Sequence, residues 1–136
     1  WAYCAPDILT TLGSIRGPFS VNQTAAEAGI IAVGDTAFQD ASLTHSKRWI
    51  DDMTHFFTSA GLSVAPSATN FILIGFGGHN GPSAEETARY LASKNILFRE
   101  MAPYGLRDYL RMSIGTDDEM QLVKQTLSEF FPVHRK

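Results

Sequence analysis

The chain has 136 residues, of which 44% are hydrophobic and 18% charged, and its formal net charge is −3 at pH 7. A chain of this length forms one domain, or one domain with a connecting helix, and buries a sizeable core. The acidic balance and the lack of a basic run argue against nucleic acid as a partner. The longest apolar run, residues 71–76, is too short to span a membrane.

The N-terminal residues also bear on location. Cys4 is the only cysteine, so no disulfide forms within the chain, which favours a reducing cytoplasm. The first residues lack the basic start and the long apolar core of a signal peptide. The chain opens instead on Trp1-Ala2-Tyr3-Cys4 with no methionine. Such an apolar start is typical of a segment of a longer polypeptide, and we expect a cytoplasmic protein.

The first part of the chain is expected to form three helices. Pro6 suits the first turn of a helix that ends near residue 14. Asn22 caps a second helix that is apolar on nearly all sides, so we expect that helix to be buried. A long amphipathic helix follows and stops near Gly61. Its candidate core positions are Phe38, Leu43, Trp49, Met53, Phe56 and Phe57.

The second part alternates strands and helices. Short apolar runs predict four strands, at residues 62–64, 70–76, 96–99 and 110–114. The run at 70–76 is the strongest and is consistent with a central position. Two capping boxes, Ser83 with Glu86 and Thr116 with Glu119, begin helices that end near residues 94 and 131, the second stopped by Pro132. This order predicts an α/β (α+β) fold, with a small sheet packed by helices and preceded by linking helices.

Arg111 is the leading candidate site residue. It lies inside the short apolar strand at 110–114, and a guanidinium on a half-buried strand is costly unless an anion meets it. No acidic residue lies within the strand, so the partner comes from elsewhere in the fold or from a ligand. Because arginine's planar fork binds carboxylate and phosphate through two hydrogen bonds, we predict that Arg111 binds an anionic substrate. The alternative is a structural ion pair.

Other features fail as sites. The glycine-rich stretch at 75–81 has the wrong spacing for a dinucleotide fingerprint, and no lysine follows it as in a phosphate-binding loop. Ser46-Lys47 resembles the pair around a Schiff-base lysine, but it falls within a helix on the expected solvent side, where the amine stays protonated. Four histidines show no metal-ligand spacing and are interpreted as surface or packing residues: His45, His55, His79 and His134.

Three ordered motifs carry a resemblance to a known family. They are residues 16–22 (RGPFSVN), 66–74 (PSATNFILI) and 104–116 (YGLRDYLRMSIGT). In this order they resemble the C-terminal part of the histidinol-phosphate aminotransferases, pyridoxal-phosphate enzymes of the fold type I superfamily. The resemblance covers nearly the whole chain. It implies a small C-terminal domain at 35–136, preceded at 1–34 by the end of a large domain and linking helices.

The resemblance implies roles for two arginines. Arg111 matches the arginine that binds the substrate's α-carboxylate, and Arg99 matches the arginine that reaches the phosphate end of the substrate. Arg99 equally suits a surface pair with Glu100 or another acid. Asn22 and Asn70 match recurrent family positions, for which turn-capping and backbone-satisfying roles are favoured.

The resemblance also implies a reaction, a cofactor and partners. The reaction is amino-group exchange between L-glutamate and imidazole-acetol phosphate in histidine biosynthesis, with pyridoxal 5'-phosphate as cofactor. The cofactor lysine and the aspartate that pairs with the pyridine nitrogen lie upstream of the segment matching Trp1. We therefore expect the 136 residues alone to be inactive and not to hold the cofactor. The family is typically homodimeric, and the apolar helix after Asn22 fits burial against the large domain or a partner subunit.

Two alternatives remain open. A sister enzyme of the same fold, such as an aromatic aminotransferase or a threonine-phosphate decarboxylase, would use Arg111 in the same way, whereas Arg99 discriminates between them. A non-catalytic ligand-binding or interaction module is the alternative from another class, because a small α/β layer serves either purpose. In that case Arg111 would be a structural ion pair.

Overall fold

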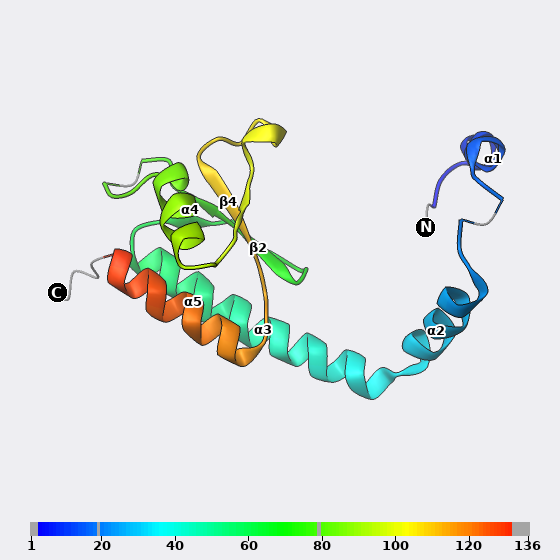
Figure 1. Cartoon of the computed structure of the whole chain (residues 1–136), viewed down its shortest axis with the longest axis horizontal. Helices are drawn as coiled ribbons and strands as arrows, with labels where there is room; N and C mark the ends of the chain where they lie inside the picture. The colour runs from blue at the N-terminus through cyan, green and yellow to red at the C-terminus, as the bar shows by residue number, and fades with distance from the viewer. Residues whose placement is uncertain (1–2, 19, 79, 132–136) are drawn as a thin grey trace. The chain divides into compact units, whose positions relative to one another are not determined.

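The computed structural model describes residues 3–18, 20–78 and 80–131. The chain divides into two compact units, Trp1–Asp40 and Ala41–Lys136. The first unit contains two helices and the beginning of a third, which continues into the second unit (Figure 1). These helices are α1 (Pro6–Ile15), α2 (Gln23–Gly34) and α3 (Thr36–Ser59). Three predictions lie outside the described residues: His79 and His134 as surface or packing residues, and Pro132 as a helix stop.

The first unit follows the predicted helix boundaries but not the predicted burial. The side chain of Asn22 accepts a hydrogen bond from the backbone N–H of Ala25 at 2.8 Å, which confirms Asn22 as the cap of α2. No residue of α2 is buried within this chain, and Ile30, Ile31 and Val33 are exposed. An all-round apolar sequence shows that a helix tolerates burial, whereas actual burial depends on a neighbour that covers it.

The second unit contains, within the described residues, a four-stranded antiparallel sheet in the order β1-β2-β4-β3. The strands are β1 (Ser63–Val64), β2 (Phe71–Gly75), β3 (Arg99–Glu100) and β4 (Tyr109–Ser113). The other elements are α4 (Ala84–Ser93), the short 3-10 helix η1 (Ala102–Tyr104) and α5 (Asp117–Phe130). The central position predicted for the strongest strand is confirmed, because β2 lies between β1 and β4. The predicted α+β class is confirmed as well.

The core lies between one face of this sheet and the helices. Ile72 and Ile74 of β2, with Leu110 and Met112 of β4, alternate along their strands onto this face and are at most 2% exposed. Helical side chains complete the same cluster: Trp49, Met53, Phe57, Ala84, Leu91, Met120, Val123 and Leu127. Figure 1 shows α3 and α5 side by side, and the Nζ of Lys124 on α5 donates to Asp52 Oδ2 on α3 at 2.7 Å.

Of the six expected core positions of α3, three are buried, Phe56 is half-buried against the core, and two are exposed. Trp49, Met53 and Phe57 are buried, whereas Phe38 and Leu43 are 69% and 68% exposed. Periodicity identifies the apolar side of a helix, but it does not say how far along that helix its neighbours extend. The prediction for Phe38 and Leu43 as core residues was therefore wrong for this chain.

Local signals placed the helix starts well and one strand poorly. Both capping boxes are present, with the backbone N–H of Ser83 and of Thr116 donating to Glu86 and Glu119 at 2.8 Å. These backbone hydrogen bonds are the main reason that the pKa of each glutamate is lowered. The strand predicted at 96–99 instead pairs only at Arg99–Glu100. Ile96 and Phe98 pack against the core without joining the ladder, whereas Leu97 is 85% exposed.

Candidate anion-binding site

Both predicted site arginines lie on the sheet face opposite the core. Because side chains alternate along a strand, Arg111 points away from the face that carries Leu110 and Met112. Arg111 pairs with Leu73 of β2 on one side and with Arg99 of β3 on the other. Directly paired residues on neighbouring strands have Cα atoms about 4.5–5.5 Å apart and share a face. We call this surface the arginine face; it carries Phe71, Leu73, Arg99, Tyr109, Arg111 and Ser113.

Arg111 is half-buried and incompletely satisfied. Its guanidinium carbon lies 4.8 Å from the centre of the Phe71 ring, a cation–π contact. Its Nε is buried and has no hydrogen-bond partner among the described residues. A buried donor without an acceptor costs about 1–3 kcal/mol, so an anion that accepts from this guanidinium would be favoured. The ring of Phe71 therefore helps to orient Arg111, while its hydrogen bonds remain available.

Arg99 is exposed and is held by a tyrosine. Its Nη1 donates to the hydroxyl oxygen of Tyr104 at 2.9 Å. Glu100, the acid next to it in sequence, pairs with Leu110 and therefore lies on the opposite face of the sheet. The ion pair between Arg99 and Glu100 that the sequence left open is not formed in this structure.

The two arginines form an uncompensated pair of like charges. Like charges directly opposite each other on neighbouring strands are destabilising. The ion pairs formed within the described ranges use other cations, namely His45, Arg48, Arg89 and Lys124. An anion bound between Arg99 and Arg111 would relieve this repulsion. The arrangement is suited to an anionic ligand.

A hollow of about 580 Å³ reaches both arginines. Its walls come from residues 95–99, from the end of β4 with the turn that follows, and from the first half of α5. Glu119 is the one carboxylate that lines it, and that group is committed to the capping box with Thr116. Apolar side chains such as Phe98 and Ile114 complete the wall. This composition, mostly apolar with a few charged groups, is typical of small-molecule sites.

A polar cluster fixes the turn that follows β4. Asp117, the first residue of α5, accepts hydrogen bonds from Trp49 Nε1 at 2.6 Å and from Arg48. The Nε2 of His45 lies 2.8 Å from the carbonyl oxygen of Gly115, and its Nδ1 lies 3.6 Å from Asp117 Oδ1. Because a carbonyl oxygen only accepts, Nε2 is the donor in this bond. His45, expected to be a surface or packing residue, therefore has a defined structural role. Together with Arg48 and Trp49 it holds the turn after β4 against α3.

We expect acid to weaken this cluster. The indole N–H of Trp49 is the main cause of the lowered pKa of Asp117, and Arg48 and His45 add to it. Because the folded-state pKa is lower, the stabilisation is fully present above the unfolded-state pKa, about 3.9, and is lost as the pH falls through the folded-state value. D117A should therefore lower Tm at neutral pH, with a difference from wild type that shrinks in acid. Thermal unfolding from pH 7 to pH 2 measures this.

The exposed Asp51 on α3 provides a matched control for that substitution. D51A removes a carboxylate of the same type without leaving the indole N–H of the buried Trp49 unpaired. Its Tm should stay close to wild type across the same pH range. A Tm difference between D117A and wild type that is constant from pH 7 to pH 2 would contradict the assignment.

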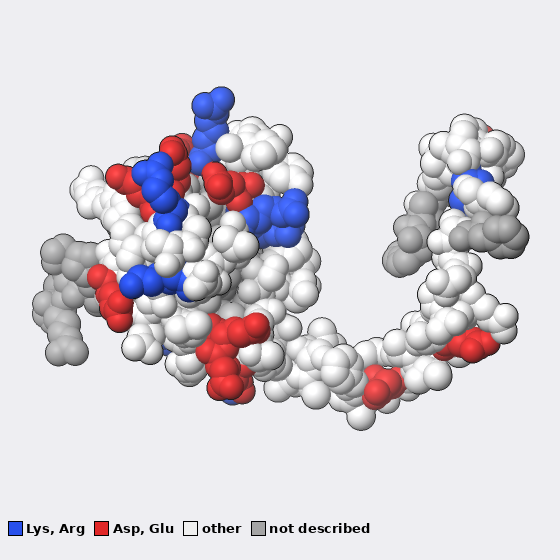
Figure 2. Space-filling view, in the orientation of Figure 1, with Lys and Arg blue, Asp and Glu red and all other residues white. Residues whose placement is uncertain are grey.

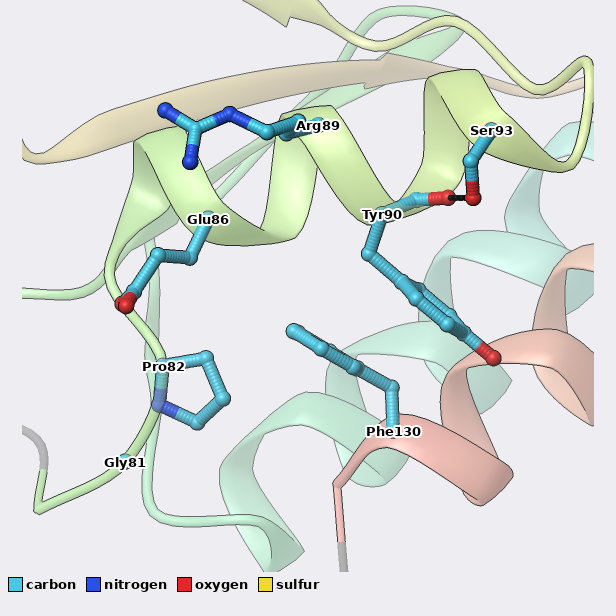
Figure 3. Close-up of a pocket in the computed structure, with 7 residues that line it drawn as sticks. All are labelled: Gly81, Pro82, Glu86, Arg89, Tyr90, Ser93 and Phe130. Carbon is cyan, nitrogen blue, oxygen red and sulfur yellow. Dashed lines mark hydrogen bonds between the residues drawn. The ribbon is translucent and has the colours of Figure 1, made fainter.

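A second hollow, between α4 and the end of α5, lacks free polar groups (Figure 3). Tyr90 and Phe130 stack in it with ring centroids 4.2 Å apart. Glu86 is held in its capping box, and Ser93 Oγ donates to the carbonyl oxygen of Tyr90 at 2.6 Å. Arg89 pairs with Glu85. We assign no ligand to this hollow, because its polar side chains already have partners.

Charge and metal-ligand patterns add no further site. Figure 2 shows acidic and basic side chains interspersed over the second unit on the face in view, without a continuous basic patch. Within the described ranges, no cluster of three or more histidine, cysteine or acidic side chains is arranged to hold a metal ion. In the same part of the chain, no helix has both the length and the apolar character that crossing a bilayer requires. Lys47 is exposed, as expected.

Sequence reasoning alone assigned no role to Phe71 or Tyr104, although they contact the two arginines. Alternation along β2 puts Phe71 and Leu73 on one face, but which residues of β4 they meet depends on strand register. Tyr104 stood within a recognised motif, and its position shortly after Arg99 was the one available signal. The cluster around Asp117 depends on contacts between residues 68 to 70 positions apart, which no local pattern reveals.

The comparisons agree with this fold. The sequence model of the aminotransferase class I and II family matches residues 1–127, so the chain belongs to that family. Within it, the chain is similar to histidinol-phosphate aminotransferases. It is 40% identical over 130 residues to the one from Paramagnetospirillum magneticum, which covers 96% of this chain and 36% of that protein. The chain thus spans little more than a third of the length of the curated relatives it matches.

Solved structures show the same fold in enzymes of different names. Histidinol-phosphate aminotransferase from Sinorhizobium meliloti, solved with pyridoxal 5'-phosphate, is 25% identical with a TM-score of 0.73, covering 93% of this chain and 35% of that one. L-threonine-O-3-phosphate decarboxylase from Porphyromonas gingivalis is 24% identical with a TM-score of 0.61, covering 94% and 40%. Fold likeness therefore does not discriminate between these two activities.

Proposed function

We propose that this chain is the substrate-clamping portion of a pyridoxal-phosphate-dependent aminotransferase, most like the histidinol-phosphate aminotransferases. The reaction would exchange an amino group between L-glutamate and imidazole-acetol phosphate in histidine biosynthesis. The observation that carries the proposal is the adjacent, unneutralised pair of Arg99 and Arg111 beside a largely apolar hollow. The similarity to the relative from P. magneticum supports the particular substrate.

The two arginines would bind the anionic groups of the two substrates. Arg111, on the interior strand β4 and oriented by Phe71, would bind the α-carboxylate of L-glutamate through two charge-assisted hydrogen bonds. Such a clamp would fix the orientation of the amino acid so that the bond to its Cα hydrogen is aligned for cleavage. Arg99, one strand further out, would bind the phosphate of imidazole-acetol phosphate.

The described residues do not fit a complete cofactor site. Lys124 is bonded to Asp52, and the Nζ of Lys94 lies 5.7 Å from the ring centre of Tyr90. Neither these lysines nor the exposed Lys47 line the hollow beside the arginines. Pyridoxal phosphate supplies an electron sink through a lysine Schiff base. We therefore propose that residues outside this chain hold the cofactor, and that the 136 residues alone are inactive.

The remaining proposals concern organisation. We assign residues 1–34 to the end of a large domain with linking helices and 35–136 to a small domain. The division into compact units after Asp40 supports a boundary in this region. The exposed apolar side chains of α2 support its burial against a large domain or a second subunit of a homodimer. The single cysteine supports a cytoplasmic location.

Amino-transfer assays test the proposal directly. The full native reading frame that encodes this chain should transfer the amino group of L-glutamate to imidazole-acetol phosphate when supplied with pyridoxal phosphate. The purified 136-residue chain should not. Turnover by the chain alone would contradict the assignment of the cofactor site. Absence of turnover by the native reading frame would favour a non-catalytic binding module.

Arg99 separates the proposed enzyme from a sister enzyme without a phosphate-bearing substrate. In the native reading frame, R99A should lower kcat/KM for imidazole-acetol phosphate by about 10- to 100-fold, the effect of losing a hydrogen bond to a charged group. Transamination of phenylalanine should change little. The matched control is R107A, which removes an exposed arginine from the turn before β4. Equal losses with both substrates would remove the phosphate role.

A further inference from the structure

The connection between β3 and β4 is shaped to present Tyr104. Its 3-10 turn is closed by hydrogen bonds from Tyr104 N to Met101 O at 2.9 Å and from Gly105 N to Ala102 O at 3.0 Å. Gly105 has a φ of 79°, in the left-handed region that suits glycine, and it redirects the chain toward β4. The turn therefore fixes the backbone of Tyr104 beside the end of β3.

The hydrogen bond between Arg99 and Tyr104 has only one possible direction. Arginine carries donors only, so its Nη1 donates and the phenol oxygen accepts, at 2.9 Å. The phenol proton is then free to point to another acceptor. Accepting from a cation also polarises the hydroxyl and strengthens it as a donor. Within the described ranges, Tyr104 makes no hydrogen bond as a donor.

The three residues that carry donor groups are neighbours along the sheet edge. Arg111 pairs with Arg99 across the strands, and Arg99 contacts Tyr104. A carboxylate at the outer position offers two oxygens and one charge, whereas a phosphate monoester offers three oxygens and up to two charges. A guanidinium together with a hydroxyl donor matches the larger anion better.

We propose that Tyr104 is a specificity-determining residue that holds Arg99 in place and donates its phenol proton to the phosphate of the substrate. This inference rests on the proposed function, because it assigns a further contact to the same substrate. Y104F removes only the hydroxyl, so it abolishes both the bond to Arg99 and the bond to phosphate. Since the side chain is 61% exposed, the variant should fold with the wild-type Tm.

Inorganic phosphate is the first probe, used with the 136-residue chain itself. An NMR titration should shift the side-chain signals of Arg99 and Tyr104, and Y104F should bind phosphate about tenfold more weakly, as expected for one hydrogen bond to a charged group. Y90F is the matched control, since it removes a phenol on α4 that bonds to Thr126 instead. Binding of acetate should be equal in Y104F and wild type.

Kinetics in the native reading frame provide the second readout. Y104F should raise KM for imidazole-acetol phosphate about tenfold and leave both kcat and the KM for phenylalanine near wild type. Unchanged phosphate affinity in Y104F would overturn the inference, even where R99A loses affinity. Lack of transamination by the wild-type reading frame would overturn the proposed function, while the phosphate titration still decides the role of Tyr104.

Discussion

Replacing Arg111 with methionine is expected to reduce kcat/KM of the native reading frame for L-glutamate by about 10³-fold. The substitution removes two charge-assisted hydrogen bonds, each worth about 1.5–3 kcal/mol, from the α-carboxylate. L-glutamate and phenylalanine should lose activity to the same extent, because each carries that carboxylate, whereas imidazole-acetol phosphate carries a phosphate and no carboxylate. Steady-state kinetics with both substrates measure the effect.

The same substitution should leave the free energy of unfolding of the 136-residue chain within about 1 kcal/mol of wild type. R111M forfeits the cation–π contact with Phe71 but removes a charge next to Arg99 and a buried donor without a partner. R107M is the matched control for both measurements, and it should leave activity and stability unchanged. A large loss of stability in R111M would show instead that Arg111 is a structural residue.

Replacing Phe57 with alanine should destabilise the second unit by about 3–5 kcal/mol, the usual cost of emptying a buried phenylalanine site. Phe57 is 1% exposed and meets Phe56 edge to face, with ring centroids 5.3 Å apart. Because the whole stability of a domain is about 5–15 kcal/mol, much of it would be lost. Urea unfolding followed by circular dichroism measures the change.

Phe38 lies on the same helix and provides the control for the core substitution. It is 69% exposed, so F38A should change the free energy of unfolding by no more than about 0.5 kcal/mol. Equal destabilisation by F57A and F38A would mean that both positions are covered in the folded chain. That result would contradict the core described here.

Local chemistry explains what could be predicted from sequence. Capping boxes depend on residues three positions apart, so the starts of α4 and α5 followed from Ser83 and Thr116 alone. A continuous apolar run likewise identified β2 as an interior strand. Arg111 stood out because its charge contradicts the apolar strand around it, and that contrast is visible without any structure.

Long-range geometry explains what could not be predicted. Arg99 lies opposite Arg111 because of the register between β3 and β4. That register depends on the conformation of the turn that connects the two strands, which the sequence of either strand does not specify. The start of β3 was predicted too early because Ile96 and Phe98 pack against the core from a segment that does not pair with β4. The apolar sequence of α2 does not specify which neighbour covers it, and the described residues bury none of its side chains.

The unequal pairing of β4 with its two neighbours has a consequence for ligand selection. β4 meets β2 through five residue pairs but meets β3 through two, Arg99 with Arg111 and Glu100 with Leu110. Amide hydrogen exchange should therefore be slow around Arg111 and fast along β3 and η1, which open locally at little cost. A carboxylate bound by Arg111 would therefore contact a rigid strand, whereas a group bound by Arg99 would contact a segment that adjusts its position more easily. Changes of substrate among related enzymes would then arise most readily in residues 99–104.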